Sequence, residues 1–78
     1  MICKNSDDIG KALKEARLHR SMTQKRLNEL SGYGASVIGA IEQGKYNHSA
    51  GITMIIELFK ALDMDVTIEI KDIENDDV

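Results

Sequence analysis

The side chains most often used in catalysis and metal binding are few in this chain, and their spacing supports neither role. His19 and His48 lie about 29 positions apart, and neither has a second ligand at metal-binding spacing. Cys3 is the only cysteine, so neither an internal disulfide nor a cysteine zinc cluster can form, which fits a reducing cytoplasm. The spacing suggests no serine–histidine–aspartate triad and no carboxylate pair. We therefore expect a cytoplasmic protein that is not an enzyme and needs no metal or cofactor.

Two glycine motifs could hold a phosphate but are more typical of turns. Gly32-Tyr33-Gly34 has neither the preceding strand nor the third glycine of a dinucleotide-binding fingerprint. Gly44-Lys45 lacks the glycine-rich loop that precedes such a lysine in a phosphate-binding loop. Nucleotide binding is therefore not expected at either place.

Charge is divided unevenly along the chain. Residues 1–62 carry nine lysines and arginines against six acidic residues, whereas residues 63–78 carry one lysine against seven acidic residues. The net charge of −3 therefore combines a basic body with an acidic C-terminal part. This asymmetry favours nucleic-acid binding by the body, although a solvated charged surface gives the same pattern. Lys25 and Arg26 leave the same two alternatives open, a phosphate clamp or a solvated face.

Composition limits the fold to one small domain. The chain has 78 residues, of which 42% are hydrophobic and 29% charged, and it contains no proline, which favours helix. A chain of this length buries only about 60% of the surface that its unfolded form exposes, so a second core is excluded. Its apolar runs reach three residues, far short of the roughly 20 that a membrane-spanning helix needs, so we expect no membrane association.

Apolar spacing predicts four helices within a domain of residues 7–62. The first covers residues 7–20, the second is short and follows Thr23, the third covers residues 35–43, and the fourth begins at Ile52. Ser6, Asp7 and Asp8 can cap the first helix, Thr23 the second, and Gly32 can end the second in a left-handed turn. The expected inward-facing side chains are Ile9, Ala12, Leu13, Ala16, Leu27, Leu30, Val37, Ile38, Ile41, Ile52, Ile55, Ile56, Phe59 and Leu62.

After Asp63 the apolar period changes from 3.6 to 2. This alternation predicts a half-buried strand over residues 63–71, between the helical domain and an acidic, disordered tail of residues 72–78; residues 1–6 are expected to be a flexible N-terminus. A lone strand leaves its backbone N–H and C=O groups unpaired, and the simplest partner is the same strand in a second copy. The expected dimerisation residues are Met64, Val66, Ile68 and Ile70.

The order of helices and turns resembles the Cro/repressor-type (XRE) helix-turn-helix family over residues 9–62. The residues that match the family's pattern are Thr23-Gln24, Leu27, Gly32, Ile38 and Ile41-Glu42-Gln43-Gly44-Lys45. Arg17 falls seven residues before Gln24, where that family has an arginine that pairs with the glutamate matching Glu42. The resemblance implies a mostly α, lambda-repressor-like helix-turn-helix bundle of four helices, here followed by a C-terminal β-strand that pairs across a dimer.

The same resemblance makes residues 35–43 the recognition helix that lies in the major groove of DNA. Base contacts are then expected from the start of this helix, and phosphate contacts from the start of the second helix and the residues after the third. The expected base-contacting residues are Ala35, Ser36, Val37 and Ala40. The expected phosphate-contacting residues are Thr23, Gln24, Lys25, Gln43, Lys45 and Asn47. Since the base-contacting residues are small, thymine-methyl contacts, one serine hydrogen bond and DNA shape would supply the specificity.

Three functional hypotheses follow from these features. The first is a homodimeric transcriptional repressor that binds a palindromic operator. The second is narrower: a single strand after the fourth helix resembles HipB-type antitoxins, whose partner is a HipA-type kinase toxin. The third is a protein-interaction module that neutralises a partner protein without reading an operator.

Overall fold

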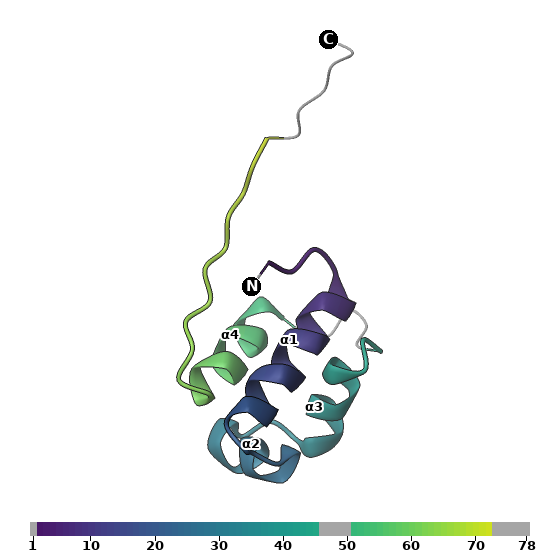
Figure 1. The fold of residues 1–78 in the computed structure, drawn as a ribbon, viewed down its shortest axis with the longest axis vertical. Helices are drawn as coiled ribbons and strands as arrows, with labels where there is room; N and C mark the ends of the chain where they lie inside the picture. The colour runs from purple at the N-terminus through teal and green to yellow at the C-terminus, as the bar shows by residue number, and fades with distance from the viewer. Residues whose placement is uncertain (1, 46–50, 73–78) are drawn as a thin grey trace.

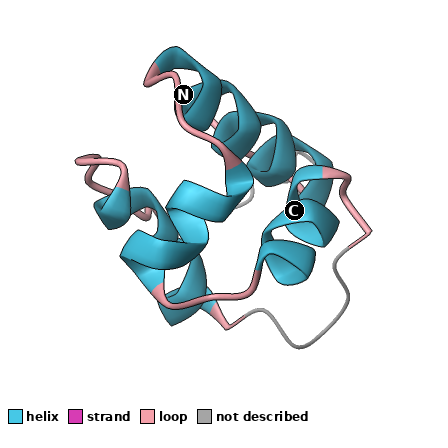
Figure 2. Ribbon diagram, turned by 90° about the horizontal axis from the view of Figure 1, so that it is seen from below, coloured by secondary structure: helices cyan, strands magenta, loops and turns pink. Residues whose placement is uncertain are grey.

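The computed structural model describes residues 2–45 and 51–72, and within these ranges it contains four helices and no strand (Figures 1 and 2). They are α1 (Ser6–His19), α2 (Gln24–Ser31), α3 (Ala35–Glu42) and α4 (Ile52–Ala61). Packing of α3 against both α1 and α2, and of α2 against α4, forms the bundle. The predicted four-helix, helix-turn-helix architecture is confirmed.

Local signals set most helix ends, and one of them differs from the prediction. Asn5, and not Ser6, Asp7 or Asp8, is the N-cap of α1, because its side-chain oxygen accepts a hydrogen bond of 2.9 Å from the backbone N–H of Asp8. Asp7 and Asp8 lie in the first turn, where their negative charge interacts favourably with the positive end of the helix dipole. Thr23 caps α2 as predicted, and Gly32 ends that helix with a φ of 83°.

The core is formed by apolar side chains from all four helices. Leu27 is the buried residue of α2, whereas Leu30 is exposed, contrary to prediction, because the inward face of this two-turn helix runs through Leu27 and Asn28. Ile52 is also exposed, since it begins α4 at the edge of the core, and Leu58, which the prediction omitted, is fully buried. The buried apolar residues in the described ranges are Ala12, Leu13, Ala16, Leu27, Ile38, Ile41, Leu58, Phe59 and Leu62.

A glycine allows α1 to approach the end of α3 closely. A Cβ atom at Gly10 would collide with the backbone carbonyl oxygen of Ile41, and backbone cannot move aside as a flexible side chain can. Gly44, in the turn after α3, has a φ of 69°, and a Cβ there would collide with Asp7. Both glycines therefore bring the two helices together, and the backbone conformation at Gly44 additionally favours glycine.

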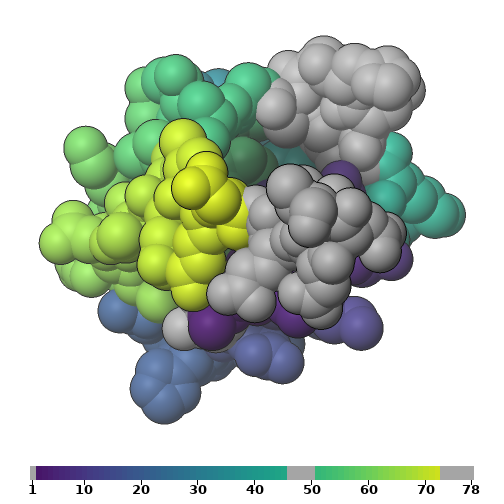
Figure 3. Space-filling model, turned by 90° about the horizontal axis from the view of Figure 1, so that it is seen from above, coloured from purple at the N-terminus to yellow at the C-terminus, as the bar shows by residue number. Residues whose placement is uncertain are grey.

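Residues 63–72 follow α4 without regular secondary structure and lead away from the bundle (Figure 1). Met64 and Val66 pack against the core, whereas Ile68 is 54% and Ile70 93% exposed. In the space-filling view, the yellow-green to yellow atoms of this segment lie on the outer surface (Figure 3). A β-strand needs a neighbour for its backbone hydrogen bonds, so the paired strand across a dimer stays a prediction. Most of the predicted tail, from residue 73 onward, lies outside the described residues.

Candidate nucleic-acid interface

A buried ion pair fixes α1 to the end of α3. Arg17 Nε donates to Glu42 Oε2 at 2.7 Å and Arg17 Nη2 to Glu42 Oε1 at 2.9 Å, so the contact is bidentate. The third guanidinium nitrogen, Nη1, donates to the backbone oxygen of Met22 at 2.7 Å. Arg17 is 7% and Glu42 9% exposed. The structure thus brings together the two residues that the family resemblance paired.

Gln24 joins this ion pair from the first residue of α2. Its Nε2 donates to Glu42 Oε1 at 3.1 Å, and the residue is half-buried. Three helices therefore meet at one carboxylate. The sequence prediction assigned Gln24 to a DNA phosphate, and the structure shows that its amide N–H already has a partner within the protein.

Electrostatics keeps the Glu42 carboxylate charged. Burial would by itself raise its pKa, but hydrogen bonds from Arg17 and Gln24 and the positive charges of Arg17 and Lys14 hold the pKa below the ordinary value of 4.5. The hydrogen bond to Glu42 raises the pKa of Arg17, and burial opposes this in part. Both groups are therefore ionised wherever the protein is folded near neutral pH.

The first turn of α3 presents small side chains to solvent. Ala35 and Ser36 are exposed, as expected of residues that contact bases, whereas Ala40 is half-buried and exposes less surface than predicted. Val37, which was predicted both to face inward and to contact bases, is also half-buried. Val37 packs against the core, because a helix of eight residues cannot bury Ile38 and Ile41 without drawing in the neighbouring side chain. The surface available for base contact is consequently smaller than the sequence indicated.

Four of the six residues expected to contact phosphates are exposed. Thr23 and Lys25 are exposed at the start of α2, and Gln43 and Lys45 are exposed after α3. Thr23 uses its hydroxyl oxygen to accept from the backbone N–H of Arg26 at 3.0 Å, which leaves the hydroxyl hydrogen for another acceptor. Asn47 lies outside the described residues.

Two contacts that the sequence reasoning did not assign hold the turn between α2 and α3. Asn28 Nδ2 donates to the backbone oxygen of Tyr33 at 2.6 Å, and the hydroxyl of Tyr33 donates to Glu57 Oε2 on α4 at 2.5 Å. Asn28 and Tyr33 lie only five positions apart, but no sequence pattern predicted their contact. The contact between Tyr33 and Glu57 joins residues 24 positions apart and had no local signal.

Gly39 lies in the middle of α3, where a larger residue would fit. A Cβ atom there would have its nearest neighbour, the Gln24 amide nitrogen, at an ordinary contact distance of 3.6 Å. We expect Gly39→Ala to raise the free energy of unfolding by about 0.5–1 kcal/mol, since alanine loses less conformational entropy in a helix. Urea denaturation followed by circular dichroism measures the change. Gly32→Ala is the control and should be destabilising, because Gly32 has a positive φ; stabilisation by both would contradict this account.

The helices α2 and α3 are short and are joined by a glycine turn; α3 is held to α1 by an ion pair and exposes its first turn. This arrangement defines a helix-turn-helix DNA-binding protein. Residues 13–68 match the family described as Helix-turn-helix, and the chain belongs to the XRE-type helix-turn-helix proteins. The protein is therefore a DNA-binding transcriptional regulator.

A solved structure agrees with this assignment. The chain is similar to the restriction-modification controller protein C.AhdI from Aeromonas hydrophila, with 32% identity and a TM-score of 0.71 over 77% of this chain and 88% of that chain. None of the curated proteins compared with the sequence matches it.

Other kinds of site were sought in the same residues. In the described ranges no group of three or more histidine, cysteine or acidic side chains could hold a metal ion. No helix in residues 2–45 and 51–72 is both long enough and apolar enough to cross a membrane.

Proposed function

We propose that the protein acts as a homodimer that represses transcription by occupying a pseudo-palindromic operator. The observation that supports this most is the exposed first turn of α3 on a scaffold fixed by the buried pair of Arg17 and Glu42. Since the two halves of such a dimer bind one face of the duplex, its half-sites should be about 34 Å apart, or a near multiple.

Base reading by this helix would differ from that of relatives with long polar side chains. Ala35 can contact a thymine methyl group and the Ser36 hydroxyl can make one hydrogen bond, but neither can make a bidentate contact to a purine. Much of the specificity would therefore come from the shape and deformability of the DNA. We expect an operator in which few positions are invariant.

Selection of duplexes from a random pool tests operator recognition. Enrichment of one symmetric sequence by the full chain supports the repressor proposal. If no sequence is enriched while the chain binds a protein tightly, the third hypothesis, a protein-interaction module, replaces it. Footprinting on the selected site then gives the half-site spacing.

Salt dependence tests the phosphate contacts. With Lys25 and Lys45 neutralising one phosphate each in both protomers, log K should fall with log salt at a slope of about −3.6. Lys25→Ala should make the slope shallower by about 1.8, because each dimer loses two phosphate contacts. Fluorescence anisotropy between 50 and 300 mM salt measures both. Lys60→Ala, which removes an exposed charge from α4, should leave the slope unchanged; equal slopes in all three proteins would show that Lys25 does not contact a phosphate.

The likeness to a restriction-modification controller favours one class of regulated gene. We propose that the operator lies beside genes for a restriction endonuclease and its methyltransferase, and a reporter joined to that promoter should be repressed by the chain. The predicted HipA-type kinase partner implies a different neighbouring gene and a stable complex. Co-expression with a kinase encoded in the same operon, followed by purification, separates the two proposals.

A further inference from the structure

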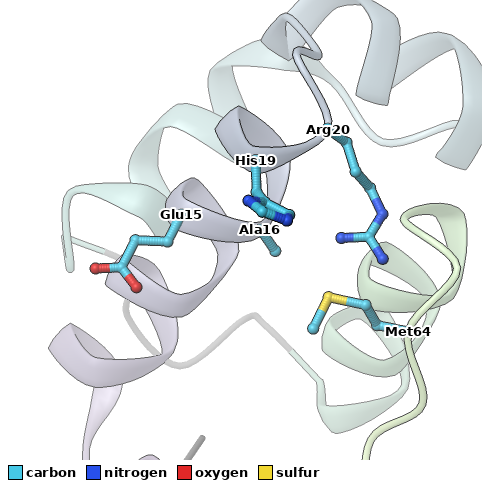
Figure 4. Close-up of a pocket in the computed structure, with 5 residues that line it drawn as sticks. All are labelled: Glu15, Ala16, His19, Arg20 and Met64. Atoms are coloured by element: carbon cyan, nitrogen blue, oxygen red, sulfur yellow. The ribbon is translucent and has the colours of Figure 1, made fainter.

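A hollow of about 270 Å³ lies between the C-terminal half of α1 and the start of the C-terminal segment (Figure 4). Ala16 and Met64 give it apolar walls, and His19 and Arg20 lie at its edge. In the close-up, Met64 and Arg20 face Ala16 and His19 across the hollow, whereas Glu15 points away. The hollow is larger than one aliphatic side chain, and Ala16 and Met64 provide apolar surface that such a side chain can contact.

The C-terminal segment has aliphatic side chains that are exposed among the residues that the structure describes. Met64 and Val66 pack against the core, and the period of two places Ile68 and Ile70 on the same side of the segment. Ile70 is nevertheless 93% exposed. Ile68 and Ile70 thus extend the row of Met64 and Val66 with apolar side chains that a second chain can contact.

A second copy can complete it, because the segment is complementary to itself. In an antiparallel pair about a two-fold axis, every register centred on a residue keeps the even-numbered residues on one face, and three such registers near the middle of the segment have the axis at residue 66, 67 or 68. The register centred on Thr67 pairs Met64 with Ile70 and Val66 with Ile68, twice each. The axis at residue 66 places Ile70 opposite Leu62, which is already buried in the core, and the axis at residue 68 places Met64 opposite Asp72, so apolar pairing favours Thr67.

Charge does not oppose this register. On the outer face it places Asp63 opposite Lys71 of the other copy, which is favourable, and Asp65 opposite Glu69, which is unfavourable by a similar amount. The aliphatic pairs therefore decide the register.

We propose that Ile70 of a second copy fills the hollow beside Met64, with the two C-terminal segments paired about Thr67. This inference rests on the dimer of the proposed function and adds its register and its anchor residue. Each four-helix bundle then contacts residues 64 and 66 of its own chain and residues 68 and 70 of the second copy. The hollow is complete only in the dimer.

Single-cysteine variants test the register. In a Cys3→Ser background, Val66→Cys, Thr67→Cys and Ile68→Cys each place a thiol at one of these three two-fold positions. Only Thr67→Cys should form a covalent dimer on mild oxidation, since only there do identical residues face each other. A mixture of Met64→Cys and Ile70→Cys chains should also crosslink, and neither variant should do so alone.

Truncation of the anchor tests the hollow. Ile70→Ala should weaken dimerisation about 100-fold or more, because each dimer loses two buried isoleucines. Leu30→Ala is the matched control, since it removes an exposed aliphatic side chain from α2 and should leave the dimer unchanged. Sedimentation equilibrium measures both.

The outcomes separate this inference from the proposed function. A dimer that crosslinks at residue 66 or 68, or that tolerates Ile70→Ala, overturns the register and the anchor while the repressor dimer stands. A chain that is monomeric at concentrations where it binds a symmetric operator overturns the dimer itself and this inference with it.

Discussion

Replacement of Glu42 with alanine is expected to lower the free energy of unfolding by about 3–5 kcal/mol, because it leaves the buried Arg17 cation without its partner. Domains of this size have a total stability of about 5–15 kcal/mol, so the variant should be partly unfolded or close to it. The Gln24 amide loses its acceptor as well. Urea denaturation of wild type and variant, followed by circular dichroism, measures the difference.

The matched control is the exposed pair on α2. Arg26 Nη1 contacts Glu29 Oε2 at 3.1 Å, with both side chains about half exposed. Glu29→Ala should therefore cost no more than about 0.5 kcal/mol. If both alanine variants cost the same, burial does not distinguish the two pairs and the anchoring role of Glu42 is refuted.

The buried pair of Arg17 and Glu42 should make the stability of the protein depend on pH in acid. Because the pKa of Glu42 is held below 4.5 in the folded protein, its contribution is present above the ordinary pKa of the unfolded chain. That contribution is lost as the pH falls through the lower, folded value. The stability gap between wild type and Glu42→Gln should therefore be constant near neutral pH and shrink below about pH 4. A gap that stays constant down to pH 2 would contradict the depressed pKa.

A chain that ends after Thr67 is expected to bind a symmetric operator about 10²–10⁴-fold more weakly than the full chain. It keeps Met64 and Val66, which pack on the core, and loses Ile68 and Ile70. In a dimer, binding of one protomer holds the other close to the second half-site and so raises its effective concentration there. Without the paired segments the two protomers bind their half-sites independently, and this gain in affinity is lost. Electrophoretic mobility shift on a full operator, with sedimentation to follow the oligomeric state, measures the loss.

Two controls localise that effect. A chain that ends after Asp72 should dimerise and bind like the full chain. On a duplex with a single half-site, the shorter chain and the full chain should bind equally well. If the chain ending after Thr67 still dimerises, the C-terminal segment is not the dimer contact.

Helix positions were predictable where the physics is local. Thr23 and Gly32 mark the ends of α2 by capping and by left-handed backbone, and no other part of the molecule is needed to predict either. Asn5 was missed because three capping-competent residues follow it directly. The contact between Arg17 and Glu42 was predicted only by resemblance to a family, since no local pattern joins residues 25 positions apart.

Burial in the short helices was harder to predict. In α2 and α3, each of eight residues, an apolar side chain can lie either on the core face or beside it, and crossing angles decide between them. Leu30 and Ala40 illustrate opposite errors, one exposed where burial was expected and one half-buried where exposure was expected. The pairing of the C-terminal segment depends on a second molecule, which no single-chain pattern contains.

Gly10 makes the tilt of the DNA-reading helix a property of α1. The Ile41 carbonyl oxygen occupies the space that a side chain at position 10 would need. Any larger residue at position 10 would therefore push the C-terminal end of α3 away from α1. The N-terminal end of α3, where Ala35 would contact a base pair, would then change its tilt. In the proposed repressor, residue 10 would thereby influence operator preference from inside the domain, where Gly10 is buried.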